Sequence, residues 1–137
     1  MMIDWVAMSE REYFANVAKR PSMFFPGTGY RAAICFLEGY GQSAARRGGS
    51  WLPGWQQWLH QRVGETGNLG WIAHVLMLVG PDLGRRIDSF TAEENERAVA
   101  RLFQLIDEYL ALRESEADDG ARDEADRAEV TGRDGAV

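Results

Sequence analysis

The apolar residues between Thr91 and Leu110 recur at three- and four-residue spacing, and this pattern constrains the fold more than any other feature of the chain. Thr91 and Glu94 begin the segment as a capping box, in which a hydroxyl and a carboxylate satisfy backbone amides of the first turn. The repeating apolar positions are Val99, Leu102, Phe103, Ile106, Tyr109 and Leu110. The spacing predicts the longest helix of the chain, with one face buried.

Two further helices are predicted before residue 47. Ser9 and Glu12 form another capping box, and the helix that begins there must end before Pro21, because a proline disfavours helical geometry at the preceding residue. Thr28 can cap the next helix, in which apolar residues recur at helical spacing up to about residue 46. A loop therefore joins the two helices over residues 20–28.

Two more helices are predicted between residues 53 and 80. Pro53 suits the first turn of a helix that Gly64 closes. Residues 68–79 form a helix with almost no polar face, so we expect it to be buried on all sides at the centre of the domain. The apolar run within it is too short to cross a bilayer, which needs about 20 residues.

Three small residues of the second helix carry specific expectations. Gly39 and Gly41 each cost about 1 kcal/mol relative to alanine inside a helix, so a close approach by another helix or an aromatic ring is expected there. Cys35, the only cysteine, lies in the apolar pattern and is expected to be a buried, inert thiol. A single cysteine excludes an internal disulfide and fits a reducing, cytoplasmic location.

No segment alternates at period two, so the sequence predicts an all-α fold: a compact, irregular bundle of about five helices. We expect residues 1–113 to form a single helical domain with the fourth helix buried. Residues 114–137 replace the apolar pattern with acids and glycines, and we expect a flexible, disordered acidic tail with at most a frayed helix around 122–130.

The charge of the chain is concentrated in that tail. The net charge is −6, and residues 114–137 hold nine acidic and three basic residues, so residues 1–113 are neutral. A neutral body argues against a phosphate-binding face, and we expect neither a nucleic acid nor a membrane as partner. The acidic segment would instead attract a basic protein, such as a nuclease.

Catalytic and metal signatures are absent from the sequence. His60 and His74 are 14 residues apart on different predicted helices, outside any spacing typical of a metal pair. No serine lies in a nucleophile turn, and adjacent carboxylates on a helix point in different directions. We therefore expect no catalytic residue, no metal and no cofactor, and a protein that acts by contact.

The expected partner-binding residues surround a tryptophan-rich segment. Trp51 follows a glycine pair in a loop, where an exposed aromatic beside Arg46 and Arg47 has the chemistry of an interface anchor. Trp55 and His60 complete the predicted set. By spacing, Trp55 and Trp58 share one helix face, and the alternative interpretation places both in the core.

Two other functions remain open from the residues. A small-molecule-binding domain or minor enzyme would line an aromatic pocket with Tyr30, Tyr40, Trp51, Trp55 and His60. A self-associating adaptor would join two copies through exposed aromatics. The sequence does not determine the oligomeric state.

Short motifs spread over about residues 9 to 112 resemble a family of small uncharacterised bacterial proteins. The motifs are residues 20–24 (RPSMF), 36–40 (FLEGY), 58–59 (WL), 70–71 (GW) and the leucine-rich helix 102–110. The family pattern runs Arg-Pro-x-Met-Tyr, Phe-Leu-x-Gly-Tyr, Trp-Leu and Gly-Trp, with Phe24 here in place of tyrosine. Members of this family resemble immunity-type proteins, cytosolic chains that neutralise a partner toxin by occlusion. The resemblance implies a protein-binding role and supplies no catalytic residue.

Overall fold

The computed structural model describes residues 4–27, 29–64, 70–80, 83 and 87–134, and all regular structure in these ranges is helical. The α-helices are α1 (Glu10–Lys19), α2 (Tyr30–Arg46), α3 (Trp55–Val63), α4 (Trp71–Val79) and α5 (Ala92–Asp134), with short 3-10 helices η1 (Pro21–Met23) and η3 (Ile87–Ser89). The predicted all-α bundle of five helices is therefore confirmed. The predicted Thr28 cap and the predicted helix start at residue 68 lie outside the described residues.

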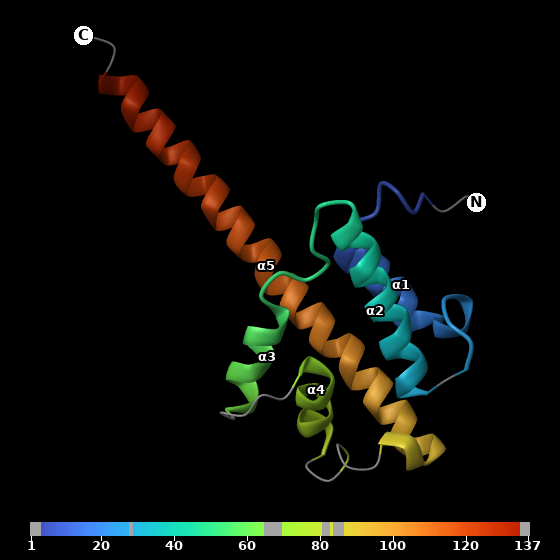
Figure 1. Ribbon diagram of the computed structural model, residues 1–137. Helices are drawn as coiled ribbons and strands as arrows, with labels where there is room; N and C mark the ends of the chain where they lie inside the picture. The colour runs from blue at the N-terminus through green and yellow to red at the C-terminus, as the bar shows by residue number, and fades with distance from the viewer. Residues whose placement is uncertain (1–3, 28, 65–69, 81–82, 84–86, 135–137) are drawn as a thin grey trace.

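Helix α5 runs through the middle of the bundle and contacts helices on both sides (Figure 1). Helices α1 and α2 lie along one side, while α4 lies on the other side and α3 packs against α4. Helix α4 is buried only in part, because His74, Val75 and Leu76 are buried while its other residues are partly exposed, so the expected burial on all sides is wrong. The centre of the domain is α5, because only α5 contacts α1, α2 and α4 among the main helix pairs.

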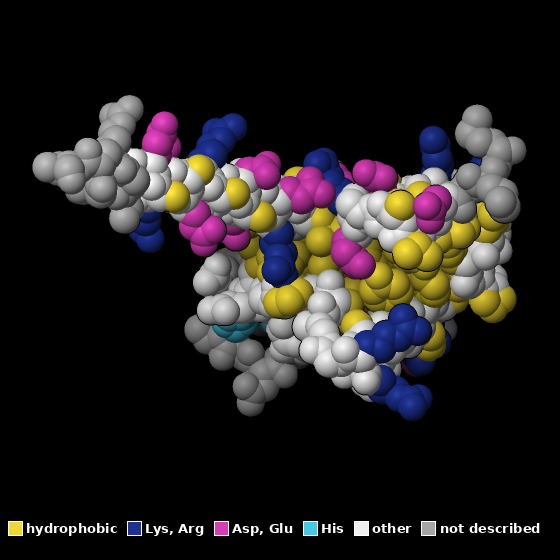
Figure 2. Space-filling model, turned by 90° about the horizontal axis from the view of Figure 1, so that it is seen from above, with side chains coloured by type: hydrophobic (Ala, Val, Ile, Leu, Met, Phe, Trp, Pro, Cys, Tyr) yellow, Lys and Arg dark blue, Asp and Glu magenta, His cyan; other side chains and the backbone are white. Residues whose placement is uncertain are grey.

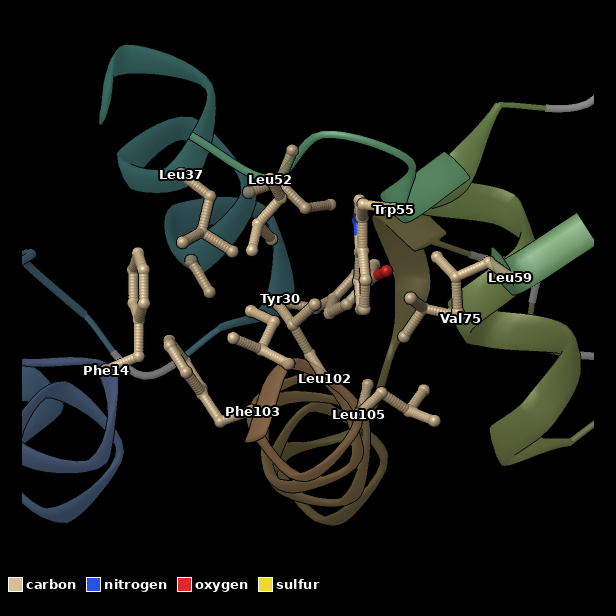
Figure 3. Packing of buried hydrophobic residues seen from close by; sticks show 14 of the residues in the cluster. Phe14, Tyr30, Leu37, Leu52, Trp55, Leu59, Val75, Leu102, Phe103 and Leu105 are labelled. Atoms are coloured by element: carbon tan, nitrogen blue, oxygen red, sulfur yellow. The ribbon is translucent and has the colours of Figure 1, made fainter. Parts of the chain in front are cut away.

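The core forms where all five helices turn apolar side chains towards one another (Figure 3). The labelled residues are Phe14, Tyr30, Leu37, Leu52, Trp55, Leu59, Val75, Leu102, Phe103 and Leu105. The predicted stripe of α5 supplies much of this core: Leu102 and Ile106 are fully buried, and Val99 is partly buried. Burial of these side chains is the main source of stability for the fold.

The predicted capping box at Thr91 is present in full, and of the box predicted at Ser9 the described hydrogen bonds show the hydroxyl half. The Ser9 hydroxyl accepts from the Glu12 amide at 3.1 Å. In α5 both halves form: the Glu94 amide donates to the Thr91 hydroxyl at 3.1 Å, and the Thr91 amide donates to the Glu94 carboxylate at 3.0 Å. These bonds satisfy amides that a helix leaves without internal partners.

Helix α2 begins on a side chain supplied by α5. Gly29 at its N-cap has no side chain, and the Asn95 amide oxygen accepts from the Tyr30 amide at 2.9 Å. The Tyr30 hydroxyl in turn donates to the Ile72 carbonyl of α4 at 2.9 Å. Tyr30 thus joins α2 to α5 and to α4 through polar bonds inside the apolar core.

The segment expected to be a disordered tail continues α5 as a helix to Asp134. All side chains described between Glu114 and Glu129 are exposed, and Figure 1 shows this part projecting beyond the bundle. The apolar stripe stops near Leu112, as the sequence indicated, but the helix does not. Alanine, glutamate and arginine have high helix propensity, and a packed helix in front of them removes the cost of nucleation.

Candidate functional site at the end of helix α2

Trp51 lies in the loop between α2 and α3, with its indole packed against neighbouring rings. Its ring centroid is 6.1 Å from that of Phe14, 6.3 Å from that of Tyr40 and 6.1 Å from that of Trp71. The side chain is half-buried. Trp51 was expected to be a freely exposed anchor. It is instead held by rings from α1, α2 and α4, and only part of its surface is open to a partner.

Gly41 explains how the Trp51 indole can come so close to α2. A Cβ atom at this position would be 2.9 Å from both Cδ1 and Nε1 of the indole. The sequence predicted an approach by an aromatic ring at Gly39 and Gly41, and the prediction is confirmed at Gly41. At Gly39 it is wrong, because nothing in the described chain lies within 4 Å of such a Cβ.

Tyr40 connects the same region to α1. Its ring stacks on Tyr13 with centroids 5.6 Å apart, and its hydroxyl donates to the Glu10 carboxylate at 2.7 Å. Burial raises the pKa of the Tyr40 phenol, and the hydrogen bond and negative charge of Glu10 raise that pKa further. The phenol therefore remains a hydrogen-bond donor at neutral pH.

These side chains border a surface hollow of about 320 Å³ beside the last turn of α2. Its lining includes Glu10, Tyr40, Ser43, Arg47, Ser50 and Trp51. A second hollow, of about 540 Å³, adjoins it through Ser43 and Arg47 and includes Arg46. Figure 2 shows the molecule from above, with a broad hydrophobic area that both basic and acidic side chains border. We refer to the two hollows together as the α2 hollow.

Arg46 and Arg47 are exposed, and neither forms an ion pair or side-chain hydrogen bond within the described part of the chain. Some other arginines of the bundle are engaged, since Arg11 pairs with Asp107 at 2.9 Å and Arg62 with Glu108 at 3.3 Å. The two guanidinium groups beside the α2 hollow are thus available to an external partner.

Trp55 does not belong to this surface. Its side chain is 3% exposed, stacks on Trp58 with centroids 5.7 Å apart and points into the core (Figure 3). Its position on the inner face of α3 requires this burial, so the prediction that Trp55 contacts a partner is wrong. The alternative interpretation, which placed Trp55 in the core, is confirmed.

His60 also lies apart from the α2 hollow. It is half-buried on α3, and its ring meets that of His74 on α4 with centroids 5.4 Å apart. The structure therefore brings together Arg46, Arg47 and Trp51 from the predicted set, and it separates Trp55 and His60 from them.

The alternative aromatic pocket is not formed by the residues expected to line it. Tyr30 is completely buried and Trp55 almost so, each packed against other core side chains. Only Tyr40 and Trp51 line a common hollow. The expectation of one pocket lined by all five residues is therefore corrected.

Three further observations on the described residues concern metal binding, membrane-spanning helices and the cysteine. No group of three or more metal-ligating side chains occurs among them. None of the described helices combines the length and apolar character needed to span a bilayer. Cys35 is exposed, contrary to expectation, because it faces outward between the buried positions Ile34 and Leu37 of α2.

Comparisons with protein-family models, with curated proteins and with solved structures found no match. The site is consequently defined by its geometry alone. Its polar residues Glu10, Ser43 and Ser50 were not among the site residues expected from the sequence. Glu10 is 30 positions from Tyr40, so only folding places its carboxylate at the hollow.

Proposed function

We propose that this chain is a protein-binding domain that uses the α2 hollow as its contact surface. The observation that carries the proposal is the combination of two unpaired arginines with the partly buried rings of Trp51 and Tyr40. Tryptophan, tyrosine and arginine are the residues that most often dominate binding energy at protein interfaces.

The rings are held in place before any partner arrives. Trp51 is fixed by three neighbouring rings and Tyr40 by its stacking on Tyr13 and its bond to Glu10. A partner would therefore meet a surface that loses little side-chain entropy on binding, which favours affinity.

The projecting part of α5 supports a role in attracting the partner. It carries most of the acidic excess of the chain, and its described side chains are exposed to solvent. We propose that this negative field steers a partner that has a basic region, as many nucleic-acid-cleaving toxins do. The sequence resemblance to immunity-type proteins suggests that the domain neutralises such a toxin in the cytoplasm by covering its working surface.

A blocking substitution tests the contact surface. Ser43→Trp fills the α2 hollow without removing any core contact, whereas Ser43→Ala leaves the hollow open. Affinity capture from native cells is expected to recover one stoichiometric protein with the wild type and Ser43→Ala, and to lose it with Ser43→Trp. Equal recovery with all three proteins would show that the hollow is not the contact surface.

The immunity role makes a separate prediction about the captured protein. Expressed alone, that protein should arrest growth, and co-expression of this chain should restore it, whereas the Ser43→Trp variant should not. A captured protein that leaves growth unaffected would exclude neutralisation of a toxin while leaving protein binding intact.

A further inference from the structure

The chemistry of the α2 hollow also indicates what the partner presents to it. The charged residues that line it are Arg46 and Arg47, which can only donate, and Glu10; its neutral polar residues, Gln42, Ser43 and Ser50, can donate as well as accept. The only carboxylate in its lining is Glu10, which already accepts from the Tyr40 hydroxyl. A ligand rich in acceptors would complete this set of donors.

We propose that the α2 hollow binds an acidic segment of the partner protein, with carboxylates paired to Arg46 and Arg47 and an apolar side chain against Trp51 and Tyr40. This inference rests on the proposed function and deepens it by naming the chemistry of the bound segment. Arginine suits this role because its guanidinium group can donate two parallel bonds to one carboxylate.

A local carboxylate is favoured over a polyanion such as RNA or DNA. Nucleic acid would bring many charges towards a chain whose net charge is −6 and towards the projecting acidic part of α5. A single acidic segment can pair with two arginines at close range, where the repulsion from distant acids is screened. The partner would then carry an acidic site for the hollow beside the basic region that α5 attracts.

The end of α1 provides a matched control for the two arginines. Lys19 and Arg20 are also adjacent, exposed basic residues at the C-terminal end of a helix, and neither forms an ion pair in the described part of the chain. Substituting either pair by alanine removes two positive charges and no core contact. A difference in affinity between the two double variants therefore reflects the α2 hollow rather than the change in net charge.

A random peptide library displayed on phage tests the inference on the full-length protein. Enriched peptides are expected to contain Asp or Glu next to an aromatic or aliphatic residue. Fluorescence anisotropy with a labelled enriched peptide should then show an affinity lower by about tenfold or more for Arg46→Ala/Arg47→Ala. For Lys19→Ala/Arg20→Ala the affinity should change by less than about twofold.

Several outcomes would overturn the inference. These are the absence of enriched peptides, enrichment without acidic residues, equal losses in the two double variants, or tighter binding of labelled single-stranded DNA than of any peptide. The proposed function is judged separately by the capture experiment with Ser43→Trp. If that variant loses the partner while Arg46→Ala/Arg47→Ala retains it, protein binding stands and the acidic segment is excluded.

Discussion

At the residue scale, single glycines and hydroxyls determine how the aromatic side chains fit. Gly41 allows Trp51 to approach α2, and the buried Tyr30 hydroxyl donates to the Ile72 carbonyl inside the core. Gly54 has a φ of 81°, and a Cβ there would be 2.7 Å from the Tyr109 hydroxyl. Each of these groups helps to determine where one aromatic ring lies, and a single substitution can test that placement.

Gly41→Ala and Gly39→Ala form a matched pair in α2. The added methyl group at position 41 would press on the Trp51 indole, whereas position 39 is open. We expect Gly41→Ala to lower the free energy of unfolding by about 1–3 kcal/mol. Gly39→Ala should raise it by up to about 1 kcal/mol, because alanine favours the helix. Urea unfolding measures both, and equal stabilisation would contradict the position of Trp51.

Tyr30 predicts a loss of stability at alkaline pH. Burial raises the pKa of its phenol above the ordinary value of about 10, so the folded state holds the proton more tightly than the unfolded state. This contribution is complete below the ordinary pKa and is lost as the pH rises through the raised one. The urea midpoint should therefore fall between about pH 9 and pH 12, and it should fall less in Tyr30→Phe.

At neutral pH the same variant tests the hydrogen bond. Tyr30→Phe removes the hydroxyl that donates to the Ile72 carbonyl, and we expect the free energy of unfolding to fall by about 0.5–1.5 kcal/mol. If Tyr30→Phe changes neither the free energy of unfolding at neutral pH nor the fall of the urea midpoint at alkaline pH, the Tyr30 phenol is not buried against α4.

At the element scale, helix α5 has two parts with different surroundings. Its first part is packed on both sides, while the part beyond Glu114 has exposed side chains wherever they are described. The packed part derives its stability from the core, and the projecting part depends on propensity and on continuity with the packed part. The two parts should therefore respond differently to a helix-breaking residue.

Gly120→Pro tests this difference. Proline removes an amide donor and clashes with the preceding turn, so the helix beyond position 120 should be lost. Far-ultraviolet circular dichroism should show a lower helix content, while the urea midpoint of the bundle stays unchanged. Gly120→Ala, where nothing described lies within 4 Å, should retain or increase the helix signal. An unchanged signal in Gly120→Pro would show that this segment is not helical in solution.

At the scale of the whole molecule, α5 joins the α1–α2 side to the α3–α4 side into one cooperative unit. Leu102 and Leu105 are completely buried where these sides meet. Leu102→Ala should lower the free energy of unfolding by about 2–5 kcal/mol. Tryptophan fluorescence and circular dichroism should give coincident urea transitions in the wild type. Separate transitions would mean that the two sides unfold independently.

The sequence by itself determined the helical class, the caps at Ser9 and Thr91, the buried stripe of α5 and the separation of charge between the bundle and the last 24 residues. These features are local, because helical spacing decides which residues share a face and a cap acts within one turn. The end of the apolar stripe was also visible, although it does not coincide with the end of α5.

Only the tertiary structure decided which faces meet. It placed α5 rather than α4 at the centre, buried Trp55, turned Cys35 outward and brought Glu10 to Tyr40 across 30 positions. Spacing along a helix cannot show this, because contacts between distant segments depend on how side-chain shapes fill the shared interior. The α2 hollow is a product of that packing, since its rings and charges come from α1, α2 and the loop after α2.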